Sequence, residues 1–174
     1  IAYMAFAGLP YGETDGQIFK SANRGDTWVP TNFLVNKVKM EPNGDGRQEG
    51  ERLAVDPKNS DVVYYGSLAN GLWTTRDGGA TWAKIENIPV GKRPHGVNTV
   101  IFDVGSGVTQ GKTKVVYVTV EEGGVYKTAD GGATWTRISD SGPGNMGKPR
   151  DAEIGPDRTY YVAYDNEKGA VGSV

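Results

Sequence analysis

Apolar positions along this chain fall into short runs rich in β-branched and aromatic residues, separated by polar and glycine-containing segments. Two stretches hold four such runs each, at 53–55, 62–67, 71–75 and 81–85, and again at 100–102, 115–120, 124–128 and 134–138. Runs of this length and composition predict β-strands. No segment shows the 3.6-residue periodicity of an amphipathic helix, so we expect an all-β protein.

The predicted strands belong to a repeat. Residues 62–85 align without a gap with residues 115–138 at an offset of 53, and 12 of the 24 positions are identical. A copy at 16–28 fits the second copy at an offset of 54, and a partial copy begins at 159. Four antiparallel strands in each repeated unit of this length are typical of a β-propeller blade.

We therefore predict that residues 1–174 form a single β-propeller segment of four-stranded antiparallel blades, about three of them plus a partial fourth. The blade units are expected at about 1–30, 51–86, 98–139 and 152–174. Such a segment leaves strand edges that a closed propeller would pair. It is therefore expected to be part of a larger propeller, completed by the rest of a longer chain or by another subunit.

Each unit carries a turn between its last two strands, SANRGDTW at 21–28, TRDGGATW at 75–82 and TADGGATW at 128–135. Glycine supplies the positive φ of a tight reversal, and an Asp or Asn side chain accepts backbone N–H bonds within such a turn. We interpret these turns as structural, because the asparagine of the first copy cannot act as a catalytic carboxylate. The tryptophan rings are expected to pack between neighbouring sheets. The structural residues are Asn23, Trp28, Asp77, Trp82, Asp130 and Trp135.

The turn resembles the Asp box, or BNR repeat, of sialidases and sortilin-type propellers. A longer stretch, GERLAVDP at 50–57 followed by NGLW at 70–73, is similar to the N-terminal propeller of the xyloglucanase family of glycoside hydrolases, family 74. This resemblance covers about residues 1–165. It implies two seven-bladed propellers with the glucan in a cleft between them and two aspartates that perform inverting hydrolysis. No stretch of this chain matches a catalytic motif, so we assign no catalytic residue.

Candidate substrate-binding residues lie mostly in loops expected at the ligand face of the propeller. They are Tyr11, Arg47, Glu51, Arg52 and Trp73. Tyr11 has no counterpart in the other units and is a candidate platform for a sugar ring. Arg47 or Glu51 would hydrogen-bond sugar hydroxyls, whereas an alternative has Glu51 and Arg52 paired to hold the long preceding loop in place.

Trp73 has two interpretations. It occupies the same repeat position as Phe19 and Tyr126. A position that is aromatic in every unit favours packing between blades over sugar stacking.

The sequence gives little support for a metal site or for a catalytic histidine or carboxylate. The stretch EPNGDG at 41–46 resembles the start of a calcium loop, but Arg52 stands where the closing glutamate is required. His95 is the single histidine, which excludes a multi-histidine metal site, and no nucleophile motif accompanies it. We therefore expect no metal and no cofactor. The loop carboxylates show no sign of the buried, uneven environments that separate an acid from a base; they are Glu49, Glu51, Glu121 and Glu122.

Composition narrows the class of partner. The chain has 19 basic and 21 acidic residues, a net charge of −2, no cysteine and no apolar run of transmembrane length. These features argue against nucleic-acid binding and against a transmembrane segment, and they fit an extracellular or periplasmic location. Two function classes remain. One is a carbohydrate-active propeller that binds a polysaccharide such as xyloglucan or another β-glucan, and the other is a non-catalytic module that binds a protein partner.

Overall fold

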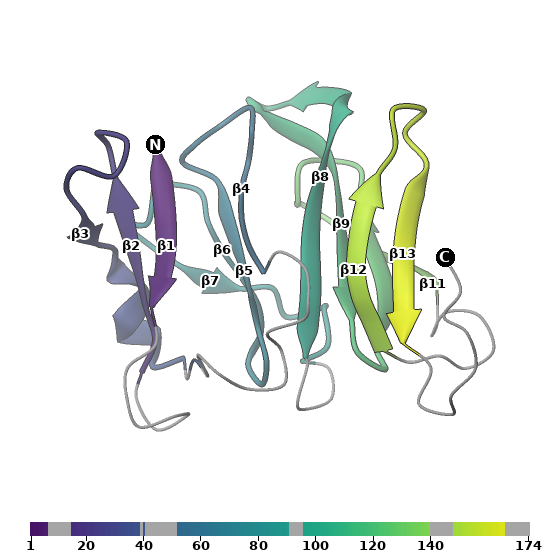
Figure 1. Ribbon diagram of the computed structural model, residues 1–174, viewed down its shortest axis with the longest axis horizontal. Coiled ribbons are helices and arrows are strands. Elements are labelled where there is room, and N and C mark those ends of the chain that lie inside the picture. Colours follow the sequence, from purple (N-terminus) through teal and green to yellow (C-terminus); the bar gives the residue numbers. More distant parts are fainter. Residues whose placement is uncertain (7–14, 39, 41–51, 91–95, 140–147, 166–174) are drawn as a thin grey trace.

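The computed structural model describes residues 1–6, 15–38, 40, 52–90, 96–139 and 148–165, which form four antiparallel sheets in succession along the chain (Figure 1). The strands are β1 (Ala2–Phe6), β2 (Gln17–Ser21), β3 (Val29–Pro30), β4 (Leu53–Val55), β5 (Val63–Ser67), β6 (Gly71–Thr75), β7 (Ala83–Lys84), β8 (Val97–Thr109), β9 (Lys112–Val120), β10 (Gly124–Thr128), β11 (Thr136–Ser139), β12 (Lys148–Ile154) and β13 (Tyr160–Asp165). Among the described residues the helical structure consists of the 3-10 helix η1 (Asn32–Asn36). The all-β prediction is confirmed.

The second and third sheets each have four strands, in the orders β4-β5-β6-β7 and β8-β9-β10-β11. Strands β6 and β10 coincide with the predicted runs at 71–75 and 124–128. Strands β8 and β9 are much longer than the predicted runs, because their hairpin continues past a register shift between Asp103 and Val108. The sequence did not indicate this extension, since Gly105 and Gly107 are more typical of a loop than of a strand.

The first and fourth sheets are smaller. Among the described residues the first sheet has three strands, in the order β1-β2-β3. Strand β2 carries Phe19, which aligns with Trp73 of β6, so β1 corresponds to the second strand of a unit. The fourth sheet pairs β12 with β13, and β12 begins at Lys148 rather than at the expected residue 152.

The hydrophobic core lies between the sheets. One cluster lies mainly between the second and third sheets, where Tyr64 and Leu72 pack against Val97 and Val116. A second cluster lies at the interface of the first and second sheets, where Ile18 and Phe33 pack against Val63, Tyr65 and Trp82. We call these interfaces the first junction (first and second sheets) and the second junction (second and third sheets). The third junction joins the third and fourth sheets.

Polar contacts also cross each junction at one end of the sheets. At the second junction the buried carboxylate of Asp56 accepts hydrogen bonds from the backbone N–H of Thr113 at 2.8 Å and from the Thr113 hydroxyl. At the third junction the guanidinium of Arg158 donates to Asp103 Oδ2 from Nη2 at 2.9 Å and from Nε at 3.2 Å. Asp56 directly follows β4 and Asp103 lies within the longer β8, in each case directly after the predicted inner run (53–55 or 100–102), so the repeat places a buried carboxylate at a similar point of successive junctions.

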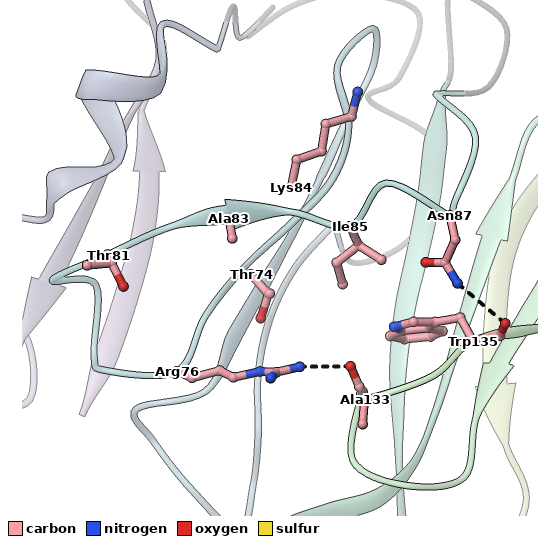
Figure 2. A pocket seen from close by; sticks show the side chains of 10 residues that line it. Thr74, Arg76, Thr81, Ala83, Lys84, Ile85, Asn87, Ala133 and Trp135 are labelled. Atoms are coloured by element: carbon pink, nitrogen blue, oxygen red, sulfur yellow. Dashed lines mark hydrogen bonds between the residues drawn. The ribbon is translucent and has the colours of Figure 1, made fainter.

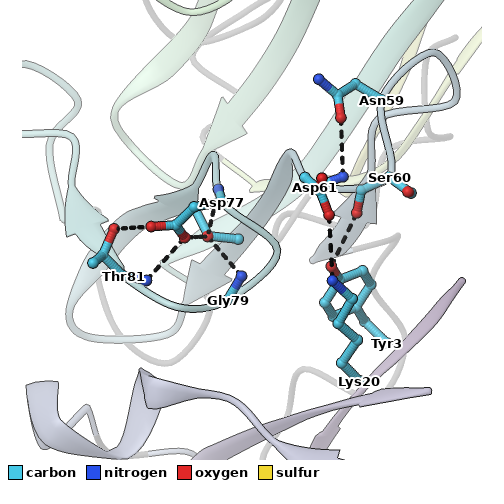
Figure 3. Close-up of polar contacts among 9 residues, drawn as sticks. Tyr3, Lys20, Asn59, Ser60, Asp61, Asp77, Gly79 and Thr81 are labelled. Atoms are coloured by element: carbon cyan, nitrogen blue, oxygen red, sulfur yellow. Dashed lines mark hydrogen bonds and ion pairs between the residues drawn. The ribbon is translucent and has the colours of Figure 1, made fainter. Parts of the chain in front are cut away.

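The first junction has a related contact. The Tyr3 hydroxyl donates to the Ser60 carbonyl at 2.9 Å, and the Lys20 ammonium lies 3.3 Å from Asp61 (Figure 3). Both acceptors lie in the segment between β4 and β5.

No helix of the described residues has the length and apolar character needed to cross a membrane.

The buried Asp56 contact leads to a stability prediction. Thr113→Val removes a hydroxyl that donates to a buried carboxylate, so we expect the free energy of unfolding to fall by about 1–3 kcal/mol. Thr136→Val makes the same chemical change on an exposed strand position and should change stability by less than about 0.5 kcal/mol. Chemical denaturation of both variants measures the difference. Equal stabilities would mean that the Asp56 contact contributes nothing.

Candidate functional site

The repeated turn has a closed set of local hydrogen bonds. In the second copy, Asp77 Oδ1 accepts the Thr81 N–H at 2.8 Å and Asp77 Oδ2 accepts the Thr81 hydroxyl at 2.6 Å (Figure 3). The Thr75 hydroxyl donates to Asp77 Oδ1 at 2.7 Å and accepts the Gly79 N–H at 2.9 Å. Both carboxylate oxygens therefore accept bonds from within the turn itself.

These bonds change the acidity of the aspartates. The hydroxyl and backbone bonds from Thr81 lower the pKa of Asp77 to about 2, because they stabilise the carboxylate form. Asp130 makes the equivalent bonds with Thr134 and Thr128, and its pKa is also lowered, mainly by the Thr134 hydroxyl. Such carboxylates are poor proton acceptors at neutral pH, which is the opposite of what a general base requires.

The first copy makes the same turn with a neutral side chain. Asn23 Oδ1 accepts the Thr27 N–H at 3.0 Å and the Ser21 hydroxyl at 3.0 Å. The Asn23 amide nitrogen donates to the Thr27 hydroxyl at 2.9 Å, so this one bond runs in the reverse direction to its equivalent in the other copies. The turn geometry therefore does not depend on a carboxylate.

The glycines of the turn lie against the preceding sheet. Gly79 O accepts the backbone N–H of Asn32 at 2.9 Å, and Gly132 O accepts Arg76 Nη2 at 2.7 Å. Both glycines have positive φ, 93° for Gly79 and 86° for Gly132. A Cβ at Gly79 would lie 2.5 Å from Thr31 Cγ2, and a Cβ at Gly132 would overlap the Tyr64 hydroxyl. Glycine is thus required both by backbone conformation and by close approach.

The tryptophans of the turns lie at the junctions. Trp82 is buried at the first junction, with its ring centroid 5.0 Å from that of Phe33 in an edge-on arrangement. Trp135 is half-buried at the second junction, 5.9 Å from Tyr64 in a similar arrangement. Trp28, in the first copy, is also half-buried.

A second group of polar residues lies at the opposite end of the sheets, where β4, β8 and β12 begin; we call this end the loop face. Arg52 precedes β4, and its carbonyl accepts the Gly66 N–H at 2.7 Å. Burial lowers the pKa of the Arg52 guanidinium, whereas the charges of Tyr65 and Glu121 act in the opposite direction. Burial raises the pKa of Tyr65 to about 12, an effect that Arg52 partly offsets. The charge of Arg52 is therefore felt at two neighbouring acidic groups from different sheets.

Glu121 corrects an expectation from the sequence. We expected the loop carboxylates to lack a buried environment, but Glu121 is only 1% exposed. It follows β9 directly, and its N–H donates to Gly96 O at 2.8 Å, which holds the backbone at this point against the residue that precedes β8. The adjacent Glu122 is exposed, with a positive φ of 53°. One of the two neighbouring carboxylates is thus buried near Arg52 and the other faces solvent.

The structure places only part of the predicted binding set. Trp73 packs edge-on against Phe33 at a centroid distance of 6.0 Å, and its indole N–H donates to the Asn70 carbonyl at 3.1 Å. It therefore contacts the first junction, whereas Arg52 lies near Glu121 of the third sheet. Tyr11, Arg47 and Glu51 lie outside the described residues.

The candidate metal ligands, which are the calcium-like stretch at 41–46 and His95, also lie outside the described residues. Within the parts of the chain that are described, no group of three or more His, Cys, Asp or Glu side chains is placed to hold a metal ion.

A pocket of about 320 Å³, which the sequence did not predict, lies at the second junction (Figure 2). It is lined by Thr74, Arg76, Thr81, Ala83, Lys84, Ile85, Asn87, Gly132, Ala133 and Trp135. The 54-residue offset aligns Asn87, one of the lining residues, with the aromatic Phe33 of the first copy. This change of residue type is the feature of the sequence that could have indicated the pocket.

The chain is similar to several known proteins, although no protein-family model matches it. A xyloglucanase of Paenibacillus sp. is 33% identical over 174 residues, which is 91% of this chain and 16% of that protein. Xyloglucanase Xgh74A of Acetivibrio thermocellus is 33% identical over 169 residues, 88% of this chain and 20% of that protein. A Hypocrea jecorina xyloglucanase is 34% identical over 177 residues, covering 90% and 20%.

Solved structures agree. The GH74 enzyme of Niastella koreensis matches with a TM-score of 0.74 and 35% identity over 87% of this chain and 22% of its own. The GH74 xyloglucanase of Xanthomonas campestris matches with a TM-score of 0.75 and 32% identity over 93% of this chain and 24% of its own. The resemblance to glycoside hydrolase family 74 and the β-propeller fold are confirmed. The chain spans about one fifth of the length of these curated relatives.

The turn carboxylates lead to a prediction on pH. Because the folded-state pKa of both Asp77 and Asp130 is lowered, their stabilisation is present above the usual carboxyl pKa of about 4 and is lost as pH falls toward about 2. We expect the Asp77→Asn, Asp130→Asn double variant to lose stability less steeply over this range than the wild type. The Asn23 turn shows that the fold accepts asparagine here. Parallel slopes of denaturation midpoint against pH would contradict the assignment.

The turn glycines lead to a second prediction. Gly132→Ala and Gly107→Ala both place a Cβ at positive φ, 86° and 89°, but only the first would meet another sheet. We expect Gly132→Ala to be less stable than Gly107→Ala by about 1–3 kcal/mol, the cost of overpacking at Tyr64. Urea unfolding of the two variants gives the comparison. A smaller loss for Gly132→Ala than for Gly107→Ala would show that the close contact is not a constraint.

Proposed function

We propose that this chain, a β-propeller segment that resembles the xyloglucanases of glycoside hydrolase family 74, belongs to a carbohydrate-active protein that binds xyloglucan or a related β-glucan. The observation that carries this proposal is the agreement of sequence and fold. Identities of 32–35% and TM-scores of 0.74 and 0.75 occur together over about nine tenths of the chain.

The loop face supplies the binding groups in this proposal. Arg52 offers a half-buried guanidinium, and the charges of the buried Tyr65 and Glu121, which come from different sheets, act on it. The guanidinium presents N–H donors that match the oxygen atoms of sugar hydroxyls. Tyr11, Arg47 and Glu51 are proposed to add contacts from the same face, with Trp73 as a further candidate.

The repeated turns have a structural role in this proposal. Their carboxylates accept bonds within the turn, and their glycines and tryptophans contact the preceding sheet. Asn23 supports this role, since a neutral side chain keeps the same turn. Asp77 and Asp130, with lowered pKa values and bonded oxygens, are proposed to be Asp-box residues and not acids or bases in catalysis.

Catalysis is proposed to need more than this chain. Inverting hydrolysis uses an acid and a base about 6.5–9.5 Å apart on opposite sides of the bond that breaks. No carboxylate pair here has a motif that assigns it to these roles, and the chain spans about a fifth of its enzyme relatives. We therefore propose binding without turnover for this segment. Like the family, it is proposed to act outside the cytoplasm.

A second candidate function is a non-catalytic module that binds a protein partner. Strand β1 lies at the edge of the first sheet and exposes Met4 and Phe6, the latter 55% exposed. An edge strand with exposed apolar side chains supports pairing with a further strand, either of a longer chain or of another protein.

Glucan binding gives the deciding experiment. In native gels containing tamarind xyloglucan, the chain should be retarded, and Arg52→Met should weaken the retardation about tenfold. Lys58→Met removes an exposed cation between β4 and β5, away from the loop face, and should have no effect. Denaturation curves confirm that both variants fold, and Arg52→Lys tests whether charge alone is sufficient.

The same preparations test turnover. Reducing ends released from xyloglucan should stay at background for the chain by itself. Retardation that is absent, or equal in Arg52→Met and wild type, would remove support for the loop face. Turnover abolished by Glu121→Gln would show an active site within this segment.

A further inference from the structure

The first and second junctions differ at one repeat position. At the first junction, Phe33 of η1 is fully buried and fills the space beside the turn tryptophan. Its ring contacts Trp82 at 5.0 Å, Tyr65 at 5.4 Å and Trp73 at 6.0 Å, all edge-on. The interior there is close-packed, as in most protein cores.

At the second junction the 54-residue offset places the exposed Asn87 at this position, and the buried apolar side chain there is that of the next residue, Ile88. The Asn87 amide donates to the Trp135 carbonyl at 3.5 Å instead of covering the Trp135 ring. The space beside Trp135 is the pocket of about 320 Å³, which lies within the size range of small-molecule sites. No ring from the second sheet is among the lining residues, in contrast to the Phe33 ring that covers Trp82 at the first junction.

The pocket walls combine an apolar surface with hydrogen-bonding groups. Thr74, Ala83 and Ile85 of the second sheet lie on one side, and Ala133 and Trp135 of the third on the other (Figure 2). The indole nitrogen of Trp135 is buried and has no hydrogen-bond partner among the described residues. At the first junction the Trp82 indole nitrogen is likewise buried without a partner among the described residues, but the Trp82 ring is covered by Phe33.

Arg76 gives the pocket a fixed donor. Its Nη2 is anchored to Gly132 O at 2.7 Å, which orients the exposed guanidinium beside both the Tyr64 hydroxyl and the pocket. Lys84 also lines the pocket, with its ammonium 3.9 Å from Glu86. Arg76 is therefore held in place in a pocket that also presents an aromatic ring.

We propose that this pocket binds one pyranose ring of a glucan chain, at a second carbohydrate site separate from the loop face. A pyranose has apolar C–H faces for Trp135 and Ile85, and adjacent hydroxyls that match the paired donors of Arg76. The choice of sugar rests on the proposed function; the pocket itself rests on Asn87, Trp135 and Arg76.

Methyl β-D-glucopyranoside is the probe for a test by NMR. A single ring of this size should bind with a dissociation constant on the order of 1 mM or weaker. The indole N–H signal of Trp135, assigned by its loss in Trp135→Phe, should shift on titration, whereas the other indole signals stay in place. No shift of this signal up to about 50 mM, well above the expected constant, would overturn the proposal.

Asn87→Phe is the matched test of the pocket, because it places a large aromatic side chain at a residue of the lining. We expect it to fold, with equal or greater stability, and to weaken the titration at least tenfold. Ile138→Phe adds the same ring at an exposed position of β11 outside the lining and should bind like wild type. Equal binding by Asn87→Phe and wild type would place the sugar elsewhere.

The outcomes separate the two sites. If Asn87→Phe abolishes the Trp135 shift and keeps the Arg52-dependent retardation by xyloglucan, both proposals stand. Suppose that xyloglucan does not retard the wild type, but that the glucoside shifts the Trp135 signal of the wild type and not that of Asn87→Phe. The pocket proposal then stands and the loop-face proposal fails. If glucuronate binds more tightly than the neutral glucoside, the two cations select an acid and the proposed neutral ring is wrong.

Discussion

The contact between each repeated turn and the sheet before it is the constraint on which the rest of the structure depends. Gly79 and Gly132 accept hydrogen bonds from Asn32 and Arg76 of the preceding unit, at the points where a Cβ would collide with that unit. Positive φ and close approach are both conditions that glycine meets at low cost. The adjoining tryptophans then add aromatic area at the same junctions.

This constraint fixes where the polar groups of the sheets lie. Because each turn contacts the preceding sheet, neighbouring sheets pack in a similar way. The inner strands β4 and β8 then bring a buried carboxylate, Asp56 or Asp103, to a partner in the next sheet. At the opposite end the same arrangement brings Arg52 of the second sheet near Glu121 of the third. Buried charges are tolerated only where a partner is held in place, so the loop-face cluster depends on the turns at the far end.

Much of the fold could be predicted because the repeat is local. Strands β6 and β10 follow from β-branched and aromatic runs bounded by glycine, and both ends agree with the sequence. The long β8–β9 hairpin could not be predicted, since its strands continue through glycines that usually end one. The burial of Glu121 was also missed, because it depends on contacts with Gly96 and Arg52 that are distant in sequence.

Comparison of the copies separates what the fold requires from what it permits. The turn keeps its bonds whether the acceptor is Asn23, Asp77 or Asp130, so the carboxylate charge is not needed to form it. A residue type that can vary without loss of geometry is a weak candidate for catalysis, however often it recurs. The difference between Phe33 and Asn87 has the opposite character, because a fully buried ring at the first junction is aligned with an exposed side chain that lines a pocket at the second. In a repeat protein the conserved positions of the unit therefore maintain the junctions, and ligand contacts are to be sought where one copy departs from the others.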